Sequence, residues 1–302
     1  MLVMPYSWLD VFAPEPFCGN QLCVFGGADD LPLPLMKKVA RELNHSETTF
    51  LQRSEVPGAD FRIRILLPTP GPAAEIPFAG HPILGSACVV AGAGKHPSTV
   101  SFETGIGVIP VTVTPLAEEG VWDARMVQPV PQVVRTAGRS PELAGALGLA
   151  LADIRDDLPL EAVDNGMQTV LIPLTSLEAV RRARPDMARL RAVLGPDGRC
   201  TLIFAPGGVE PGSHVHCRVF SPFDLVPEDP ATGSANGPLG EYLVRHGVVP
   251  GPFVRSEQGY SVGRPSRILI EVERAGGETT AVFVSGRVYM LGKGEFRLTN
   301  LT

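Results

Sequence analysis

The sequence repeats its landmarks at a nearly constant interval, and this internal duplication constrains the fold more than any other feature. Matching residues in the two halves lie 145 to 154 positions apart, as in the pairs Asn20 and Asn165, Met36 and Met187, Gly80 and Gly233, and Gly105 and Gly259. A chain of 302 residues has room for two domains of about 150 residues each. The duplication therefore predicts two pseudo-symmetric lobes that face each other across a cleft.

The Pro-rich stretch 128–131 is the expected linker between the lobes. We therefore place an N-terminal lobe at 1–127 and a C-terminal lobe at 128–284. A last strand at about 285–302 is expected to pack back on the N-terminal lobe.

Each half contains one helix made largely of small residues, at 83–91 and near 234–244. The first of these has no charged residue, and a helix that is apolar on all sides is normally buried inside a domain. Strand-like stretches surround both helices, including 6–12, 48–52 and the period-2 stretch 108–114. One amphipathic helix is expected outside this arrangement, at 30–44. The pattern predicts an α+β fold.

Composition excludes several kinds of partner. The chain has 26 Lys and Arg against 32 Asp and Glu, a net charge of −6, which argues against a broad nucleic-acid surface. No apolar run approaches the length that spans a membrane, and no basic residue precedes Lys37, as a signal peptide would require. Five cysteines without a C-x-x-C pair are read as free, buried thiols. We expect a soluble cytoplasmic protein that contacts neither nucleic acid nor membrane.

Both small-residue helices begin with glycine followed by a polar residue, Gly80-His81 and Gly233-Ser234. Glycine lets a ligand approach the backbone closely, and a helix start offers N–H groups and the positive end of the helix dipole. These starts are therefore candidate binding sites for a carboxylate. On either half alone the glycine could simply permit a turn, but its duplication favours binding.

Glu47 breaks the symmetry between the halves. It stands at the edge of an apolar strand, where a carboxylate is costly unless it is paired or used, and the equivalent stretch 199–205 contains no acid. An unmatched acid on a duplicated scaffold suggests a catalytic base. The alternative is that Glu47 caps a turn or pairs with a surface arginine.

Four motifs together resemble the signatures of the PhzF family, the phenazine-biosynthesis isomerases. They are Gly-Asn-Gln-Leu-Cys-Val-Phe at 19–25, Asn-His-Ser-Glu-Thr-Thr-Phe at 44–50, Pro-Phe-Ala-Gly-His-Pro at 77–82 and Glu-Asp-Pro-Ala-Thr-Gly-Ser-Ala at 228–235. Each motif alone is weak, but the resemblance continues to 284–286 and so covers nearly the whole chain.

The resemblance implies the fold of diaminopimelate epimerase, in which each of two lobes is a β-barrel wrapped around a central helix. It also implies a site without cofactor or metal. In that site Glu47 transfers a proton, His81 and Asp229 are catalytic residues that face the substrate, and three helix-start residues bind it: Gly80, Gly233 and Ser234.

The chain departs from related patterns at two places. The thiol-based epimerases of this fold use two cysteines, and here the corresponding positions look like Ala79 and Asp229, which excludes two-thiol racemisation. The stretch 68–75 is longer than is usual in the family, which puts the shape of the substrate in doubt. His214 and His216 share a strand face, but the sequence offers no further ligand for a metal.

These features predict a cofactor-independent isomerase that moves a proton within a small, cyclic, conjugated carboxylic acid. The family reaction is the isomerisation of trans-2,3-dihydro-3-hydroxyanthranilate in phenazine synthesis, an antibiotic pathway of secondary metabolism. Two alternatives stay open: a double-bond isomerase of another precursor, such as a pyrroline carboxylate, and a small-acid binding protein without turnover. The resemblance also implies a homodimer.

Overall fold

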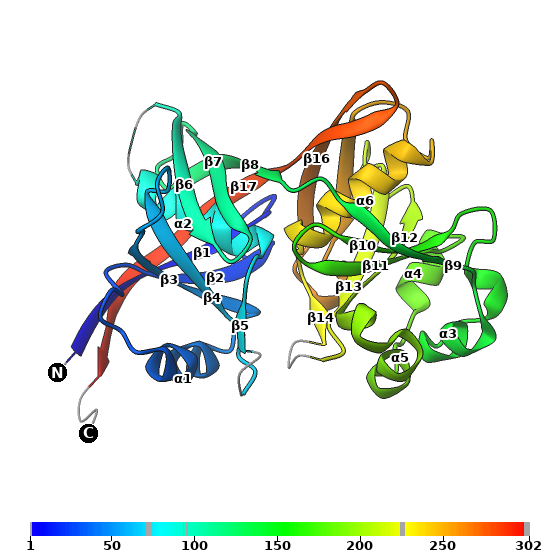
Figure 1. Cartoon of the computed structure of the whole chain (residues 1–302), viewed down its shortest axis with the longest axis horizontal. Helices are drawn as coiled ribbons and strands as arrows, with labels where there is room; N and C mark the ends of the chain where they lie inside the picture. Colours follow the sequence, from blue (N-terminus) through cyan, green and yellow to red (C-terminus); the bar gives the residue numbers. More distant parts are fainter. Residues whose placement is uncertain (1, 71–73, 93, 95, 224–226, 299–302) are drawn as a thin grey trace. The chain divides into compact units, whose positions relative to one another are not determined.

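The structure, a computed structural model, describes residues 2–70, 74–92, 94, 96–223 and 227–298 (Figure 1). The chain divides into two compact units. The N-terminal unit consists of Met1–Val127 and Ser285–Thr302, and the C-terminal unit consists of Gln128–Val284. No helix formed by the described residues is long and apolar enough to cross a membrane.

The N-terminal unit is an eight-stranded barrel with one helix outside and one inside. Its strands pair in the order β17–β1–β2–β3–β4–β6–β7–β8, and β8 returns to β17, with β2–β3 and β4–β6 parallel. The short strand β5 pairs with β4. The elements are β1 (Leu2–Val11), β2 (Asn20–Phe25), α1 (Leu33–Leu43), β3 (Glu47–Arg53), β4 (Phe61–Leu66), β5 (Glu75–Ile76), α2 (Gly80–Ala91), β6 (Ser98–Thr104), β7 (Gly107–Pro115), β8 (Val121–Gln128) and the end of β17 (Glu278–Leu298).

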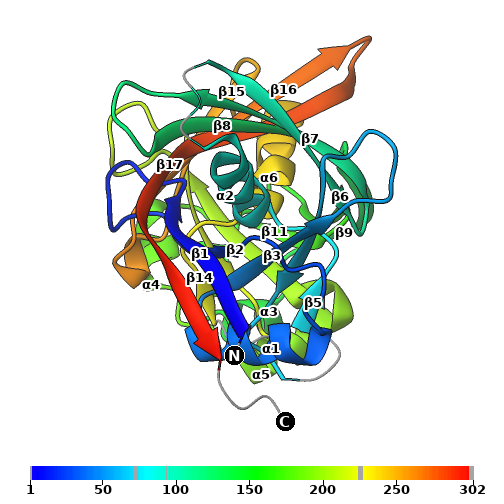
Figure 2. The same ribbon diagram turned by 90° about the vertical axis from the view of Figure 1, so that its left-hand side faces the viewer.

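Helix α2 lies inside the barrel, with strands around it (Figure 2). Its residues 80–88 are all buried, as its uncharged sequence predicts. Small residues allow the strands to approach: a Cβ at Gly85 would lie 2.5 Å from Leu22 Cδ2 and 3.0 Å from Val11 Cγ2. A hydrogen bond of 3.0 Å between the hydroxyls of Thr49 and Ser86 joins the helix to β3. Glycine at 85 is thus required by packing.

The C-terminal unit repeats this pairing. Its strands pair in the order β9–β10–β11–β12–β13–β15–β16, with β11–β12 and β13–β15 parallel where β2–β3 and β4–β6 are parallel in the first unit. The elements are β9 (Gln132–Ala137), α3 (Pro141–Ala146), η2 (Leu151–Asp153), β10 (Leu160–Asp164), β11 (Gln168–Pro173), α4 (Leu177–Arg182), α5 (Met187–Leu194), η3 (Gly195–Arg199), β12 (Cys200–Pro206), β13 (Val215–Phe220), β14 (Glu228–Asp229), α6 (Gly233–Arg245), β15 (Phe253–Gln258), η4 (Tyr260–Val262), β16 (Ser266–Ala275) and the beginning of β17.

Helix α6 is the counterpart of α2. Residues 233–243 are buried, and the helix packs on β11, β15 and β16. A Cβ at Gly240 would lie 2.5 Å from Ile270 Cγ2. Both central helices start at the glycine that the sequence predicts, and the predicted α+β fold of pseudo-symmetric barrel units is confirmed.

Strand register defines which residues of the two units are equivalent. Glu47 pairs with Leu22 at the start of a parallel ladder, and Cys200 pairs with Thr169 at the same point of the other unit. The position equivalent to Glu47 is therefore occupied by a thiol, and the acid is unmatched, as the sequence indicates.

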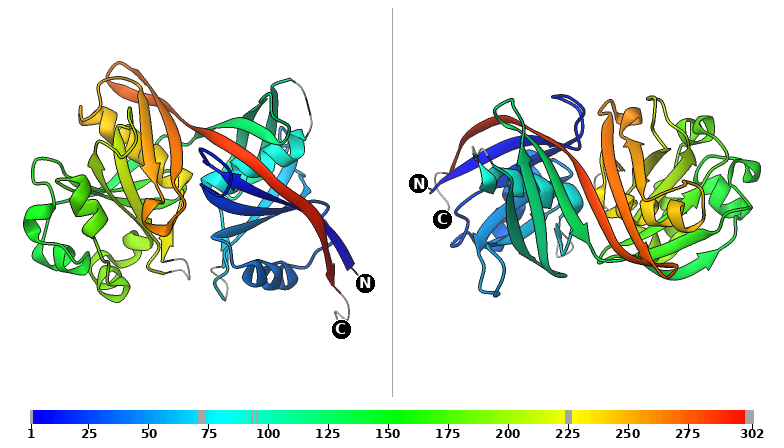
Figure 3. Two further views of the ribbon diagram at one scale, coloured as in Figure 1. Left: turned by 180° about the vertical axis from the view of Figure 1, so that it is seen from behind. Right: turned by 90° about the horizontal axis from the view of Figure 1, so that it is seen from above.

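Strand β17 belongs to both units. A two-residue turn at Gly276 and Gly277, both with positive φ, leads from β16 into β17, as is typical of a hairpin. Residues 285–298 then lie in the N-terminal unit, where β17 pairs with β1 from Leu2 opposite Leu298 to Val11 opposite Val288 (Figure 3). The first and last described residues of the chain are therefore neighbours in one sheet.

Two predicted boundaries differ from the structure. The helix predicted at 30–44 is α1 and begins at Leu33, because prolines at 32 and 34 favour a helix start there. The strand predicted at 6–12 is the longer β1, which ends at Val11 because Phe12 takes a positive φ of 61°.

Candidate functional site

Glu47 and His81 meet at one end of the N-terminal barrel. Glu47 is the first residue of β3 and His81 the second residue of α2, and Glu47 Oε2 lies 3.5 Å from His81 Nε2. Their side chains are 13% and 2% exposed, respectively. His81 Nε2 makes no hydrogen bond with the described residues. The fold thus brings together the predicted base and the predicted polar residue beside it.

Asn20 and Ser46 orient His81. Ser46 Oγ donates a hydrogen bond of 3.2 Å to Asn20 Oδ1, and Asn20 Nδ2 lies 3.1 Å from His81 Nδ1. The imidazole also hydrogen-bonds to the backbone of Gln21, so two successive residues of β2 hold the ring beside Glu47.

Burial keeps the imidazole neutral. Desolvation, with a smaller contribution from the nearby His45, lowers the pKa of His81 to about 3. At neutral pH His81 is therefore a neutral imidazole beside Glu47, and the two side chains do not form an ion pair.

Asp229, Gly233 and Ser234 lie together in the C-terminal unit. Asp229 ends β14, and Thr232, the residue before α6, donates a hydrogen bond of 2.5 Å from Oγ1 to Asp229 Oδ2. Asp229 and Ser234 are each 7% exposed. The six predicted site residues thus form two groups, one in each unit.

Neither central helix is capped by the side chain that precedes it. Ala79 stands before α2 and Thr232 before α6, and neither side chain hydrogen-bonds to the first turn. This fits helix starts that receive a ligand, since side-chain caps would otherwise occupy the first N–H groups.

Three residues that sequence reasoning did not select hold the start of α6. Gln128 Nε2 donates to Gly233 O at 3.0 Å, and Asn165 Nδ2 donates to Ser234 O at 2.9 Å. Pro238 explains the second bond, because it lacks the N–H that would bond Ser234 O four residues earlier. A proline at this helix position is a sequence signal for such an outside donor. The third residue, Gln258, contacts Asp229 and Thr232.

The two residues expected at the positions of the epimerase cysteines do not occupy equivalent places in the two units. Ala79 directly precedes α2 as Thr232 directly precedes α6. Asp229 pairs with Val219 where Ile76 pairs with Ile65, so Asp229 corresponds to Ile76. None of these four residues is a cysteine.

The cysteines form no disulfide. Four of the five are buried, and Cys18 is partly exposed. Burial raises the pKa of Cys23 and of Cys217 to about 12, which keeps both thiols protonated and poorly nucleophilic.

His214 and His216 have partners other than a metal. His214 Nδ1 accepts from the backbone of Arg255, and His216 Nδ1 lies 3.0 Å from Glu257 Oε2. Contrary to expectation, a carboxylate does stand beside His216, but no metal-binding group of three is found among the described residues.

Part of the long stretch 68–75, residues 71–73, lies outside the described residues. Its last residue, Glu75, receives two hydrogen bonds from Arg64, at 2.7 and 2.8 Å. Glu228 receives the equivalent pair from Arg218, so this end of the stretch has the same structural role in both units.

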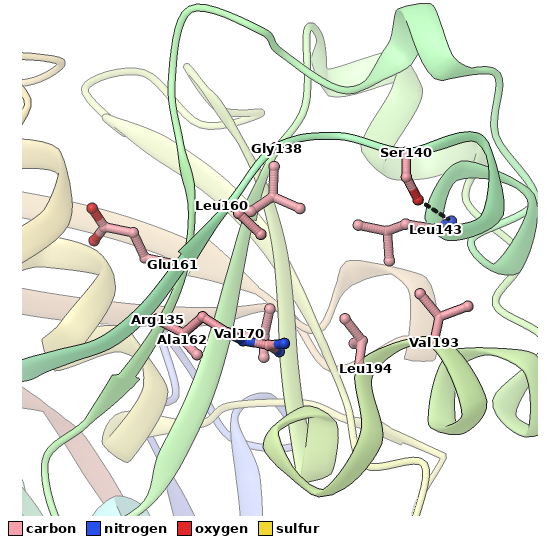
Figure 4. Close-up of a pocket in the computed structure, with 11 residues that line it drawn as sticks. Arg135, Gly138, Ser140, Leu143, Leu160, Glu161, Ala162, Val170, Val193 and Leu194 are labelled. Atoms are coloured by element: carbon pink, nitrogen blue, oxygen red, sulfur yellow. Dashed lines mark hydrogen bonds between the residues drawn. The ribbon is translucent and has the colours of Figure 1, made fainter.

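A separate cavity of about 180 Å³ lies in the C-terminal unit (Figure 4). Apolar side chains from β10, β11, α3 and α5 line it, together with Arg135 and Glu161. Glu161 is held by Arg245 and His246, and Asp229, Gly233 and Ser234 are not among the lining residues. The cavity is therefore distinct from the candidate site.

Two barrels, each around a buried helix with a polar start, define the diaminopimelate epimerase-like class of fold. A hydroxyproline epimerase from Agrobacterium vitis shares the fold, with a TM-score of 0.66, 13% identity and coverage of 99% of this chain and 92% of that one. The PhzF family protein of Bacillus anthracis is more similar, with a TM-score of 0.85, 26% identity and coverage of 99% and 100%.

Sequence comparison identifies the family within this class. The model of the phenazine biosynthesis-like family PhzC-PhzF matches residues 9–294, so the chain belongs to this family and is an isomerase. The trans-2,3-dihydro-3-hydroxyanthranilate isomerase of Pseudomonas aeruginosa is 39% identical over 283 residues, which cover 93% of this chain and 95% of that protein. The Escherichia coli protein YddE, an uncharacterized isomerase, is 33% identical over 304 residues, with coverage of 96% and 97%.

Proposed function

We propose that the protein isomerises a small, cyclic, conjugated carboxylic acid by moving a proton between two of its carbons without a cofactor. The similarity to trans-2,3-dihydro-3-hydroxyanthranilate isomerases supports that compound, or a close analogue, as the substrate. We further propose that it acts in secondary metabolism, as a cytoplasmic homodimer.

The observation that carries this proposal is the pair of Glu47 and His81. A carboxylate that is 13% exposed lies 3.5 Å from a buried imidazole nitrogen, at the start of a helix without a side-chain cap. Such a carboxylate is poorly solvated, which favours proton exchange with a bound substrate.

In the proposed mechanism Glu47 takes a proton from one carbon of the substrate and gives a proton to another, and between the two steps its carboxyl proton exchanges with solvent in part of the turnovers. The electron pair left by the first C–H bond moves through the conjugated system and forms the second C–H bond. His81, whose Nε2 lies 3.5 Å from Glu47 Oε2, keeps the carboxylate at the start of α2 by packing beside it, and Gly80 offers its backbone N–H to the negative charge that develops. Asp229, Gly233 and Ser234 bind polar groups of the substrate.

The test measures isomerisation of trans-2,3-dihydro-3-hydroxyanthranilate and uptake of deuterium from heavy water. Glu47→Gln keeps the shape but cannot accept a proton, so turnover and exchange should both fall by about 10²–10⁴-fold. Binding of the acid and the unfolding transition should change little. Asp229→Asn should be milder, by about 10–100-fold, if Asp229 only orients the substrate through hydrogen bonds.

The matched control is Glu42→Gln, which changes an exposed acid on α1 of the same unit and should leave turnover unchanged. Near-normal exchange in Glu47→Gln would remove Glu47 from the mechanism. Binding of the acid without exchange in the unaltered protein would contradict the proposed reaction.

A further inference from the structure

Gln258 lies at the centre of a hydrogen-bond network beside Asp229. It ends β15, is fully buried, and contacts both the segment that contains Asp229 and the first turn of α6. Both acceptor positions of Oε1 and both hydrogens of Nε2 are used, so the amide can take only one orientation.

Two backbone groups fix the orientation of the Gln258 amide. The N–H of Thr232 donates to Oε1 at 3.1 Å, and the backbone carbonyl of Asp229 accepts from Nε2 at 2.7 Å. A backbone N–H can only donate and a carbonyl can only accept, so exchanging Oε1 and Nε2 would break both bonds. Asn236 Nδ2 adds a further donor to Oε1 at 2.9 Å.

The fixed amide determines the direction of the Thr232 hydroxyl. Nε2 of Gln258 also lies 2.9 Å from Thr232 Oγ1 and must donate to it. The hydroxyl keeps its own hydrogen to donate, and it donates this hydrogen to Asp229 Oδ2, which lies 2.5 Å away. A carboxylate can only accept this bond, so the network favours the ionised form of Asp229 in one orientation.

We propose that Gln258 is a positioning residue, which acts through Thr232 to hold the Asp229 carboxylate ionised and fixed at the start of α6. The inference rests on the proposed function, in which the Asp229 carboxylate binds the substrate. The equivalent positions of the N-terminal unit hold Ile76, Ala79 and Thr104, which cannot form this network.

The first experiment follows the Asp229 carboxyl by carbon NMR of the full-length protein labelled at aspartate side chains, with Asp229→Asn used to assign the signal. Thr232→Val removes the donor, so the pKa of Asp229 should rise. Thr232→Ser keeps the hydroxyl and should restore the native titration. An unchanged Asp229 titration in Thr232→Val would overturn the proposal.

A second variant tests Gln258 itself. Gln258→Glu keeps acceptors for the Thr232 N–H and for Asn236 but loses the donors, so the Thr232 hydroxyl should turn toward the new carboxylate and away from Asp229. Gln258→Met removes the same donors without adding charge, and both variants should raise the pKa of Asp229. If both fold and neither does so, Gln258 does not act through Thr232.

Ser256→Ala is the matched control. Ser256 lies on the same strand and is fully buried, and its link to the network is weak: it lies 3.6 Å from Cys217 Sγ, which lies 3.9 Å from Gln258 Oε1. This variant should leave the Asp229 titration unchanged; a shift as large as that in Thr232→Val would assign the effect to general loosening of the strand and overturn the proposal.

The activity arm uses the exchange assay with trans-2,3-dihydro-3-hydroxyanthranilate. Thr232→Val should reduce kcat/KM about tenfold in the native background and have little effect in Asp229→Asn, because both variants remove one interaction. Equal effects in both backgrounds would contradict the proposed connection. If the unaltered protein shows no exchange, the proposed function fails, while the NMR titration still decides the role of Gln258.

Discussion

The two central helices begin at equivalent points of equivalent barrels, yet their surroundings differ. At the start of α2 stand an imidazole and the carboxylate of Glu47, whereas α6 begins beside Asp229, Thr232 and Gln258. The strand equivalent to β3 carries Cys200 in place of Glu47. The difference shows that a duplicated scaffold can keep its helix position while the charged residues around the two helix starts diverge.

The two units share a pair of one arginine and one glutamate that stabilises the fold. Arg64 and Glu75 form the same two-bond pair as Arg218 and Glu228, between β4 and β5 in one unit and β13 and β14 in the other. In both units the pair joins the strand to the segment that leads into the central helix. The two units thus share the pair that precedes the central helix and differ at the helix start itself, where we propose that substrate binds.

The largest expected effect comes from removing the arginine of each shared pair. Arg218 is 6% exposed and also donates to the carbonyls of Val180 and Ala183, whereas Arg64 is 17% exposed. Arg218→Met should lower the free energy of unfolding by about 3–5 kcal/mol. Arg64→Met should lower it by about 1.5–3 kcal/mol.

Each unit needs its own probe of unfolding in urea. Trp8 and Trp122 both lie in the N-terminal unit, so their fluorescence measures the loss of stability in Arg64→Met. Hydrogen exchange of backbone amides in the C-terminal unit measures the loss in Arg218→Met. Equal losses would mean that the difference in burial does not matter and that the two pairs are energetically equivalent.

The second prediction tests whether both helices need glycine for the same reason. Gly85→Ala and Gly240→Ala should each destabilise their unit by about 1–3 kcal/mol, because the added methyl overlaps Leu22 or Ile270. Gly145 is the control: it is exposed in α3 and a Cβ there meets nothing within 4 Å. Gly145→Ala should be stabilising by about 0.5–1 kcal/mol. Thermal unfolding of the three variants measures these changes in stability.

The smallest expected effect is a pH dependence of the free energy of unfolding that comes from His81 in the N-terminal unit. In the unfolded chain His81 binds a proton below about pH 6.5, whereas in the native protein its pKa is about 3, so stability falls as pH drops below about 6.5. Between pH 7 and pH 5.5 the loss should be about 1 kcal/mol. His81→Asn should remove this component, as measured by Trp fluorescence during urea unfolding at both pH values. A variant with the native pH dependence would show that other groups cause it.

Sequence predicts the features that are local or repeated. The duplication gives the two units and the glycine at each helix start, and the missing counterpart of Glu47 is visible in a single strand. The partners of the helix starts could not be predicted in this way, because they come from distant parts of the chain: Gln128 is 105 residues from Gly233, and Asn165 is 69 from Ser234. Only the final packing brings such donors to their acceptors.

Strand β17 has a consequence for how the protein is made. The C-terminal unit is one continuous stretch, Gln128–Val284, but the N-terminal unit needs residues beyond Ser285 to close its barrel between β1 and β8. On the ribosome, the half that is synthesised first is therefore completed last. At about 5–20 residues per second, the open edges of β1 and β8 wait on the order of 10–30 s for their partner. During this interval the nascent chain exposes two unpaired strand edges, which is when it is most open to chaperones and to aggregation.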